Sequence, residues 1–180
     1  MAIKQIRLTG DRAVIFSGDD ALAAPAPPVA PDGALTEAQE TDHRAAQTAY
    51  EEAKTSYDAK WNEYLKTYDV AVLPLVEGRK PTIFQIGALT IDQVTHIDGM
   101  TNFGEKVTET IAYGVHGVAG FVVVTDGQEA IAEVTRCDTK HGKRLTAESL
   151  RLFTDDALRW ELWGQVKIAS ALSKEQRKSA

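Results

Sequence analysis

Three residue types that can bind metals or transfer protons fall close together in Cys-Asp-Thr-Lys-His-Gly, residues 137–142. A thiolate, a carboxylate and an imidazole can each bind a transition metal. A structural zinc site needs four such ligands, however, and the chain contains only this one cysteine. Lys140, Lys143 and Arg144 would also repel a cation. The pattern therefore favours a polar loop over a metal site.

A second segment that could bind a ligand or take part in catalysis is Gly-Val-His-Gly-Val-Ala-Gly, residues 114–120. Its three glycines are spaced three residues apart, and His116 lies between the first two. A dinucleotide-binding loop needs two glycines one residue apart after a strand, and a phosphate loop ends in Gly-Lys-Ser/Thr. Neither pattern occurs here, so the glycines favour close helix packing or a loop that passes the core. A catalytic histidine also needs an orienting acid and a nucleophile, and the sequence identifies neither.

Paired acids at residues 19–20 and 155–156 are typical of turns and helix starts. The sequence thus predicts no catalytic, metal-binding or cofactor-binding residue, and no cofactor. A small enzyme or ligand-binding module stays open as an alternative, because His116, Cys137 and His141 could in principle converge in one pocket. Their mutual placement in the structure tests that alternative.

Composition narrows the class of protein. The 180 residues are 43% hydrophobic, which suits one domain or a small domain with an appendage. A net charge of -6, from 26 acidic and 20 basic residues, argues against nucleic acid as a partner. The N-terminus lacks the apolar core of a signal peptide, and no apolar run reaches the length of a membrane span. We therefore expect a soluble protein that is made in a cytoplasm and has no membrane partner.

The N-terminal part is predicted to leave the core and return to it. Residues 1–20 are expected to supply a β-hairpin of the core, with strands at 3–8 and 13–17. Residues 21–35 hold four of the six prolines, so they predict an extended, semi-rigid linker.

Residues 36–69 predict one long amphipathic helix, inserted as an arm. Thr36 and Gln39 have the spacing of a capping box, and neither glycine nor proline follows before residue 70. Aromatic residues recur at seven-residue intervals and lie on one stripe. This stripe predicts packing against the body or another helix, and it consists of Tyr50, Tyr57, Trp61, Tyr64 and Tyr68.

Residues 70–180 are predicted to form the rest of the core. A strand is expected at 81–86, and helices after Thr90, over 104–113, after Thr146 and after Thr154. The patch at 121–124 fits either strand or helix. Asp126 and Gly127 predict a turn, after which residues 130–136 are expected to pair back as a hairpin. Trp160 and Trp163 lie beside the apolar stripe of the last helix, and a polar tail is predicted from Ser173 onward. The predicted fold class is α+β, a small antiparallel sheet packed with helices, plus one long amphipathic helical arm.

Three segments resemble small accessory proteins of tailed bacteriophages. They are Ser-Gly-Asp-Asp-Ala-Leu after the N-terminal strand, the run from Lys80 to Thr90, and the C-terminal helix with its tail over 145–180. The helix at 36–68 departs from the resemblance and is expected to be an insertion. The resemblance implies a head or tail morphogenesis protein and brings no catalytic residue with it.

We therefore expect a non-enzymatic protein that acts through protein–protein interfaces in the virion, at the head, neck or tail. Its partners would be other phage structural proteins, or a second copy of itself, and it would reach the virion after synthesis in the host cytoplasm. A tail-assembly chaperone that is absent from the mature particle is the first alternative. The expected interface residues are Tyr50, Tyr57, Trp61, Tyr64, Tyr68, Trp160 and Trp163.

Overall fold

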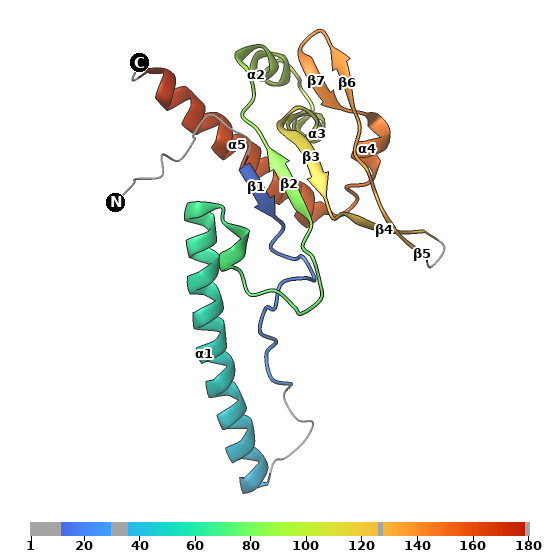
Figure 1. Ribbon diagram of the computed structural model, residues 1–180. Helices are drawn as coiled ribbons and strands as arrows, with labels where there is room; N and C mark the ends of the chain where they lie inside the picture. Colours follow the sequence, from blue (N-terminus) through green and yellow to red (C-terminus); the bar gives the residue numbers. More distant parts are fainter. Residues whose placement is uncertain (1–11, 30–35, 126–127, 179–180) are drawn as a thin grey trace. The chain divides into compact units, whose positions relative to one another are not determined.

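The computed structural model describes residues 12–29, 36–125 and 128–178. The protein has the predicted α+β fold, with small antiparallel sheets packed against helices and one long helix. The chain divides into two compact units, one made of Met1–Asp19 with Pro81–Ala180 and the other of Asp20–Lys80. Figure 1 labels the elements of both.

The described part of the first unit contains the strands β1 (Arg12–Ile15), β2 (Ile83–Ile86), β3 (Val115–Ala119), β4 (Val122–Thr125), β5 (Gln128–Ile131), β6 (Arg136–Thr139) and β7 (Gly142–Leu145). Its helices are α2 (Ile91–Asp98), α3 (Phe103–Gly114), α4 (Ala147–Arg151) and α5 (Asp156–Lys178). The second unit contains the long helix α1 (Glu37–Thr67) and the short 3-10 helix η1 (Val70–Val72).

A three-stranded antiparallel sheet in the order β1–β2–β3 lies at the centre of the first unit. Val14 of β1 is aligned with Phe84 of β2, and both are at most 2% exposed. β-Branched and aromatic side chains of this kind pack well on a pleated surface. The predicted strands at 13–17 and 81–86 are therefore confirmed as β1 and β2. The strand predicted at 3–8 lies outside the described residues.

Helices α3 and α5 pack closely at Gly114. A Cβ atom on this glycine would lie 2.4 Å from both Cγ atoms of Val166. Val166 is 0% exposed, and a β-branched side chain has one strongly preferred rotamer in a helix. A residue without a side chain is therefore required at this crossing. The predicted close helix packing of residues 114–120 is therefore confirmed at Gly114. The residues that follow form strand β3 instead.

Three phenylalanine rings join the sheet to the helices. The ring centroids of Phe84, Phe121 and Phe153 are 5.8–6.3 Å apart and meet edge to face, an arrangement that aromatic quadrupoles favour. Figure 1 shows α5 crossing one face of the β1–β2–β3 sheet. The hydroxyl of Ser170 on α5 accepts a hydrogen bond of 3.0 Å from the backbone N–H of Leu89. This hydrogen bond ties α5 to the segment that links β2 to α2.

The helix starts predicted at Thr90 and Thr146 are confirmed, whereas the last helix begins one residue later than predicted, after Asp155. Thr90 and Thr146 accept backbone hydrogen bonds at the starts of α2 and α4, and Asp155 accepts one of 2.6 Å at the start of α5. Each side chain satisfies a backbone donor that the first helical turn leaves open. The polar tail predicted from Ser173 onward is wrong, because α5 continues to Lys178. Lys, Glu, Gln and Arg are good helix formers, so polarity alone did not end the helix.

Two β-hairpins complete the unit. Residues 137–142 are not the polar loop that was predicted but lie in the hairpin β6–β7, with Cys137 opposite Arg144. A strand that is polar on both sides lacks the alternation that reveals strands in a sequence. The patch at 121–124 falls largely in strand β4, which pairs with β5 as the hairpin prediction expected. The turn predicted at residues 126–127 lies outside the described residues.

The long helix of the second unit is confirmed as α1. Gln39 N donates to Thr36 Oγ1 over 3.4 Å, and Thr36 N donates to Gln39 Oε1 over 3.0 Å. This is the predicted capping box. At the other end, Tyr68 adopts φ 52°, a left-handed conformation that terminates the helix.

The segments on either side of α1 belong to the same unit. Residues 70–80 lie here and not in the core, where the sequence placed them. Leu22 and Leu75 form an isolated antiparallel bridge. Residues 23–29 form neither helix nor strand, which agrees with the extended linker, and residues 30–35 lie outside the described residues.

Candidate protein–protein interface

Three large aromatic side chains form a partly exposed cluster on α3 and α5. The ring centroids are 5.7 Å apart for Phe103 and Trp160, 6.1 Å for Phe103 and Trp163, and 5.5 Å for the two tryptophans. Phe103 is 54% exposed and Trp160 is 51% exposed. Grouped surface aromatic residues are typical of interface hot spots. We call these three residues the α3–α5 aromatic cluster.

Local structure explains why the cluster is at the surface. Asn102 caps α3 by accepting hydrogen bonds from first-turn N–H groups over 2.8 and 3.3 Å, which makes Phe103 the first helical residue. On α5, Trp160 and Trp163 are three residues apart and therefore share one side of the helix. They flank the stripe that anchors α5 in the core. The buried residues of that stripe are Leu158, Leu162, Val166 and Ala169.

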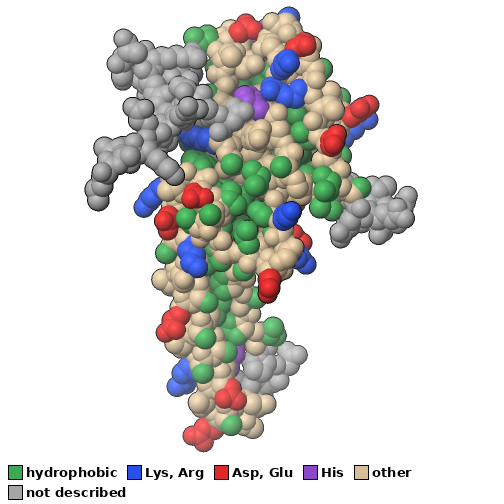
Figure 2. Space-filling view, viewed as in Figure 1, with side chains coloured by type: hydrophobic (Ala, Val, Ile, Leu, Met, Phe, Trp, Pro, Cys, Tyr) green, Lys and Arg blue, Asp and Glu red, His purple; other side chains and the backbone are tan. Residues whose placement is uncertain are grey.

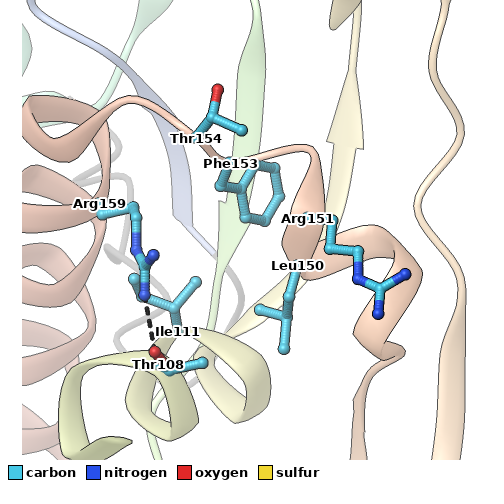
Figure 3. A pocket seen from close by; sticks show the side chains of 7 residues that line it. All are labelled: Thr108, Ile111, Leu150, Arg151, Phe153, Thr154 and Arg159. Carbon is cyan, nitrogen blue, oxygen red and sulfur yellow. Dashed lines mark hydrogen bonds between the residues drawn. The ribbon is translucent and has the colours of Figure 1, made fainter. Parts of the chain in front are cut away.

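A pocket of about 450 Å³ lies between α3, α4 and the start of α5 (Figure 3). Its lining residues are Thr108, Ile111, Leu150, Arg151, Phe153, Thr154 and Arg159.

A second hollow of about 470 Å³ lies at the start of α3. It is lined by Met100, Asn102, Gly104, Glu105, Thr108, Glu109 and Arg159. Thr108 and Arg159 line both spaces, so the two adjoin. The second hollow reaches the neighbours of Phe103 in the chain. We call the pocket, the hollow and the aromatic cluster together the α3–α5 face.

Arg159 is the polar centre of this face. Its Nη2 donates a hydrogen bond of 2.6 Å to the hydroxyl of Thr108, and Figure 3 shows the side chain reaching from α5 toward α3. Among the side chains that the structure describes, neither Arg159 nor Arg151 has a carboxylate within 4.0 Å. Arg144, by contrast, pairs with Glu109 over 2.7 Å. Arg159 and Arg151 thus form no ion pair with an acid among the described side chains, although Glu105 and Glu109 line the hollow beside Arg159.

Four of the predicted interface residues form a row along α1. The ring centroids are separated by 6.4 Å between Tyr57 and Trp61, by 5.2 Å between Trp61 and Tyr64, and by 5.9 Å between Tyr64 and Tyr68. Tyr64 is 0% exposed, whereas the other three are half-buried. Tyr50 is half-buried too but makes no ring contact with a described residue. Tyr57, Trp61 and Tyr68 are therefore partly accessible, whereas Tyr64 is covered.

Tyr57 also has a shifted ionisation. Partial burial, the larger cause, raises the pKa of its hydroxyl above the ordinary value of 10.0, and the charge of Asp58 raises it further. Tyr57 thus remains neutral near pH 7 and presents a hydrogen-bond donor at its tip.

The histidines do not assemble as the enzyme alternative requires. His141 Nδ1 lies 2.6 Å from Asp92 Oδ2, and its ring stacks on His96 with centroids 4.2 Å apart. His141 Nε2 is enclosed and has no hydrogen-bond partner among the described residues. A general base needs an accessible nitrogen within reach of the substrate, and this imidazole has none in the arrangement that the structure describes.

The other two residues of the enzyme alternative, His116 and Cys137, lie on different strands. His116 is on β3 and lies against Gly87, whereas Cys137 is exposed on β6. Within residues 12–29, 36–125 and 128–178, no group of three or more His, Cys, Asp or Glu could hold a metal ion. The side chains that the structure brings to His141 are Asp92 and His96, which the sequence did not single out.

Sequence reasoning identified both tryptophans of the α3–α5 face but missed Phe103, Thr108 and Arg159. Phe103 had a usable signal, because an asparagine before it can cap a helix and place it in the exposed first turn. Thr108 and Arg159 had none. Their contact joins two helices that are far apart in the chain, and only the folded structure brings them together.

On the side shown in Figure 2, acidic and basic side chains are interspersed, without one extended patch of a single sign. No helix in the described part of the chain combines the length and the apolar character that a membrane crossing requires.

Comparisons of the chain with protein-family models, with curated proteins and with solved structures gave no match.

Proposed function

We propose that this chain is a non-enzymatic structural or assembly protein of a tailed bacteriophage, acting through protein–protein interfaces in the virion. The observation that carries the proposal is the α3–α5 face, where Phe103 and Trp160 are more than half exposed beside Arg159. Tryptophan and arginine are among the residues most enriched in interface hot spots. The phage context comes from the resemblance of three segments of the sequence.

The exposed aromatic area favours association. A large aromatic side chain buries roughly 150–250 Å² when it is fully covered. About half of that area remains exposed on Phe103 and on Trp160. Covering it would contribute roughly 2–3 kcal/mol per side chain at about 25 cal/mol per Å². That gain is offset in part by the entropy lost on association, so further contacts are needed, and the row on α1 offers them.

Mass spectrometry of purified virions of the phage that encodes this chain tests the proposal directly. We expect peptides of the protein at a stoichiometry that repeats with the head, neck or tail symmetry. Their absence from infectious particles would refute a virion role and favour the chaperone alternative.

A matched pair of variants tests whether the face mediates assembly. Trp160→Ala removes a 51% exposed aromatic side chain from the face, and Ile131→Ala removes a 73% exposed apolar side chain from β5. We expect only the first to reduce incorporation into particles. Equal incorporation of both variants at wild-type level would contradict the role of the face.

A further inference from the structure

The pocket between α3, α4 and α5 combines an apolar floor with one cationic edge, at Arg159. Ile111 and Phe153 are buried core residues whose outer surfaces reach the pocket, and Leu150 is half-buried beside them. Arg159 stands on one side of these residues, and Arg151 lies on the other with its guanidinium group turned away from them, as Figure 3 shows. A ligand that fits must therefore carry an apolar group and a negative charge close together.

The charge on Arg159 is available to such a ligand. A guanidinium group has five N–H donors in a planar fork that matches a carboxylate. One N–H of Arg159 is used by Thr108, whose hydroxyl is neutral and so forms no ion pair with the guanidinium group. Neither Arg159 nor Arg151 has a carboxylate partner among the described side chains. Thr154 also lines the pocket.

We propose that this pocket binds a short acidic peptide segment, whose carboxylate pairs with Arg159 and whose adjacent apolar side chain packs on Ile111, Leu150 and Phe153. That the segment belongs to a phage protein rests on the proposed function. The chemistry of the pocket does not depend on that assignment.

The neighbouring hollow gives the segment a direction. Glu105 and Glu109 line that hollow, and they would repel a carboxylate placed there. The carboxylate therefore lies at the pocket end, near Arg159. The chain of the segment then continues across the hollow toward the α3–α5 aromatic cluster, where Phe103 and Trp163 can contact apolar residues.

The volume of the pocket and its continuation into the neighbouring hollow favour a peptide over a free small molecule. About 450 Å³ accommodates one or two side chains, within the roughly 300–1,000 Å³ of ligand sites in general. The pocket continues into the hollow through the shared residues Thr108 and Arg159. An extended segment can fill both spaces at once, whereas a small carboxylic acid fills only one.

Two matched peptides test the proposal on the full-length protein. The probes are acetylated, amidated leucyl-aspartyl-leucine and the same tripeptide with asparagine in place of aspartate. They differ only in the charge of one side chain. Binding is followed by chemical-shift changes of backbone and arginine N–H signals in nuclear magnetic resonance spectra. We expect the acidic peptide to shift Thr108, Leu150 and Arg159 and to bind at least about tenfold more tightly than its amide, a difference of about 1.4 kcal/mol.

Variants of Arg159 then test whether its positive charge binds the carboxylate of the peptide. Arg159→Gln is expected to weaken the acidic peptide about tenfold, and Arg159→Lys, which keeps the charge without the fork, by less. Lys167→Gln removes one positive charge from an exposed position two turns further along α5 and should leave binding unchanged. Circular dichroism of each variant verifies that the fold is intact.

Several outcomes would overturn the proposal. These are equal affinity for the two peptides, no binding of either at millimolar concentration, or equal weakening by Arg159→Gln and Lys167→Gln. Acetyl-leucine, which carries its own free carboxylate, serves as a small-molecule probe. If it binds as tightly as the acidic peptide, the pocket is a small-ligand site instead. Virion mass spectrometry tests the phage function separately, so either proposal can fail without the other.

Discussion

Replacing Gly114 with alanine tests the closest helix crossing in the core. The new methyl group would lie 2.4 Å from both Cγ atoms of Val166 and 2.9 Å from its Cβ. These separations are well below ordinary van der Waals contact. Because Val166 is 0% exposed and stiff about χ1, its side chain cannot rotate away. Helices α3 and α5 must then move apart.

The expected magnitude combines two opposing effects. Over-packing a core costs about 1–3 kcal/mol, and replacing glycine with alanine inside a helix contributes about 0.5–1 kcal/mol of stability. Since two methyl groups clash with the new one, the cost belongs near the upper limit, and we expect Gly114→Ala to lower the unfolding free energy by about 2 kcal/mol. Gly164→Ala is the control, because no atom lies within 4 Å of its added Cβ. It should raise the unfolding free energy by about 0.5–1 kcal/mol.

A double-mutant cycle isolates the contact. Val166→Ala alone should cost about 2–3 kcal/mol, from two methyl groups at about 0.8 kcal/mol each and the cavity they leave. Simple addition to the cost of Gly114→Ala predicts a loss of about 4–5 kcal/mol for the double variant. We expect only about 2–3 kcal/mol instead, because the methyl group of Ala at 114 enters the space that Val166→Ala vacates.

Urea unfolding followed by tryptophan fluorescence measures these values. A Trp61→Phe background leaves Trp160 and Trp163 as reporters, and both lie on α5. Additive losses within about 0.5 kcal/mol would show that residues 114 and 166 are not in contact. A Gly114→Ala variant as stable as the wild type would refute the close crossing itself.

Three further predictions concern α1. Thr36→Ala removes its capping box and should destabilise the first turn by about 1 kcal/mol, seen as faster amide exchange in that turn; unchanged exchange would contradict the cap. Since the folded-state pKa of Tyr57 is raised by burial and by Asp58, its contribution to stability is fully present below pH 10.0 and is lost as the pH rises toward the raised pKa. Thermal unfolding of the wild type against Tyr57→Phe measures this difference, and identical alkaline profiles would exclude it. Trp61→Ala combined with Tyr57→Ala should weaken particle assembly while circular dichroism shows a folded core, whereas unchanged assembly would count against α1 as an interface.

Local signals in the sequence predicted the helices well. Thr36, Thr90 and Thr146 each precede a helix in the structure and accept backbone hydrogen bonds there. A cap is read from residues only three positions apart, so no knowledge of the rest of the chain is needed. The central strand at 83–86 was predictable for a similar reason, since its apolar run follows directly after Pro81.

Features made by distant or unpatterned residues could not be predicted. The β6–β7 hairpin contains Cys137, Asp138 and Lys143, which give no alternation of apolar and polar residues. The placement of His141 beside Asp92 depends on how this hairpin meets α2. The pocket likewise depends on three helices meeting, and a sequence pattern records only the apolar stripe of each one.

The pairing of β1 with β2 has one more consequence. The chain leaves the core at Asp19 and re-enters at Pro81, and Thr82 N donates a hydrogen bond of 2.8 Å to Asp19 Oδ2. Two adjacent antiparallel strands of this kind can be connected by a short turn. We therefore expect that a short turn could replace residues 20–80 without loss of the β1–β2 pairing. A lineage of such proteins could gain, lose or replace the long helix, and with it a binding specificity, while inheriting the same sheet.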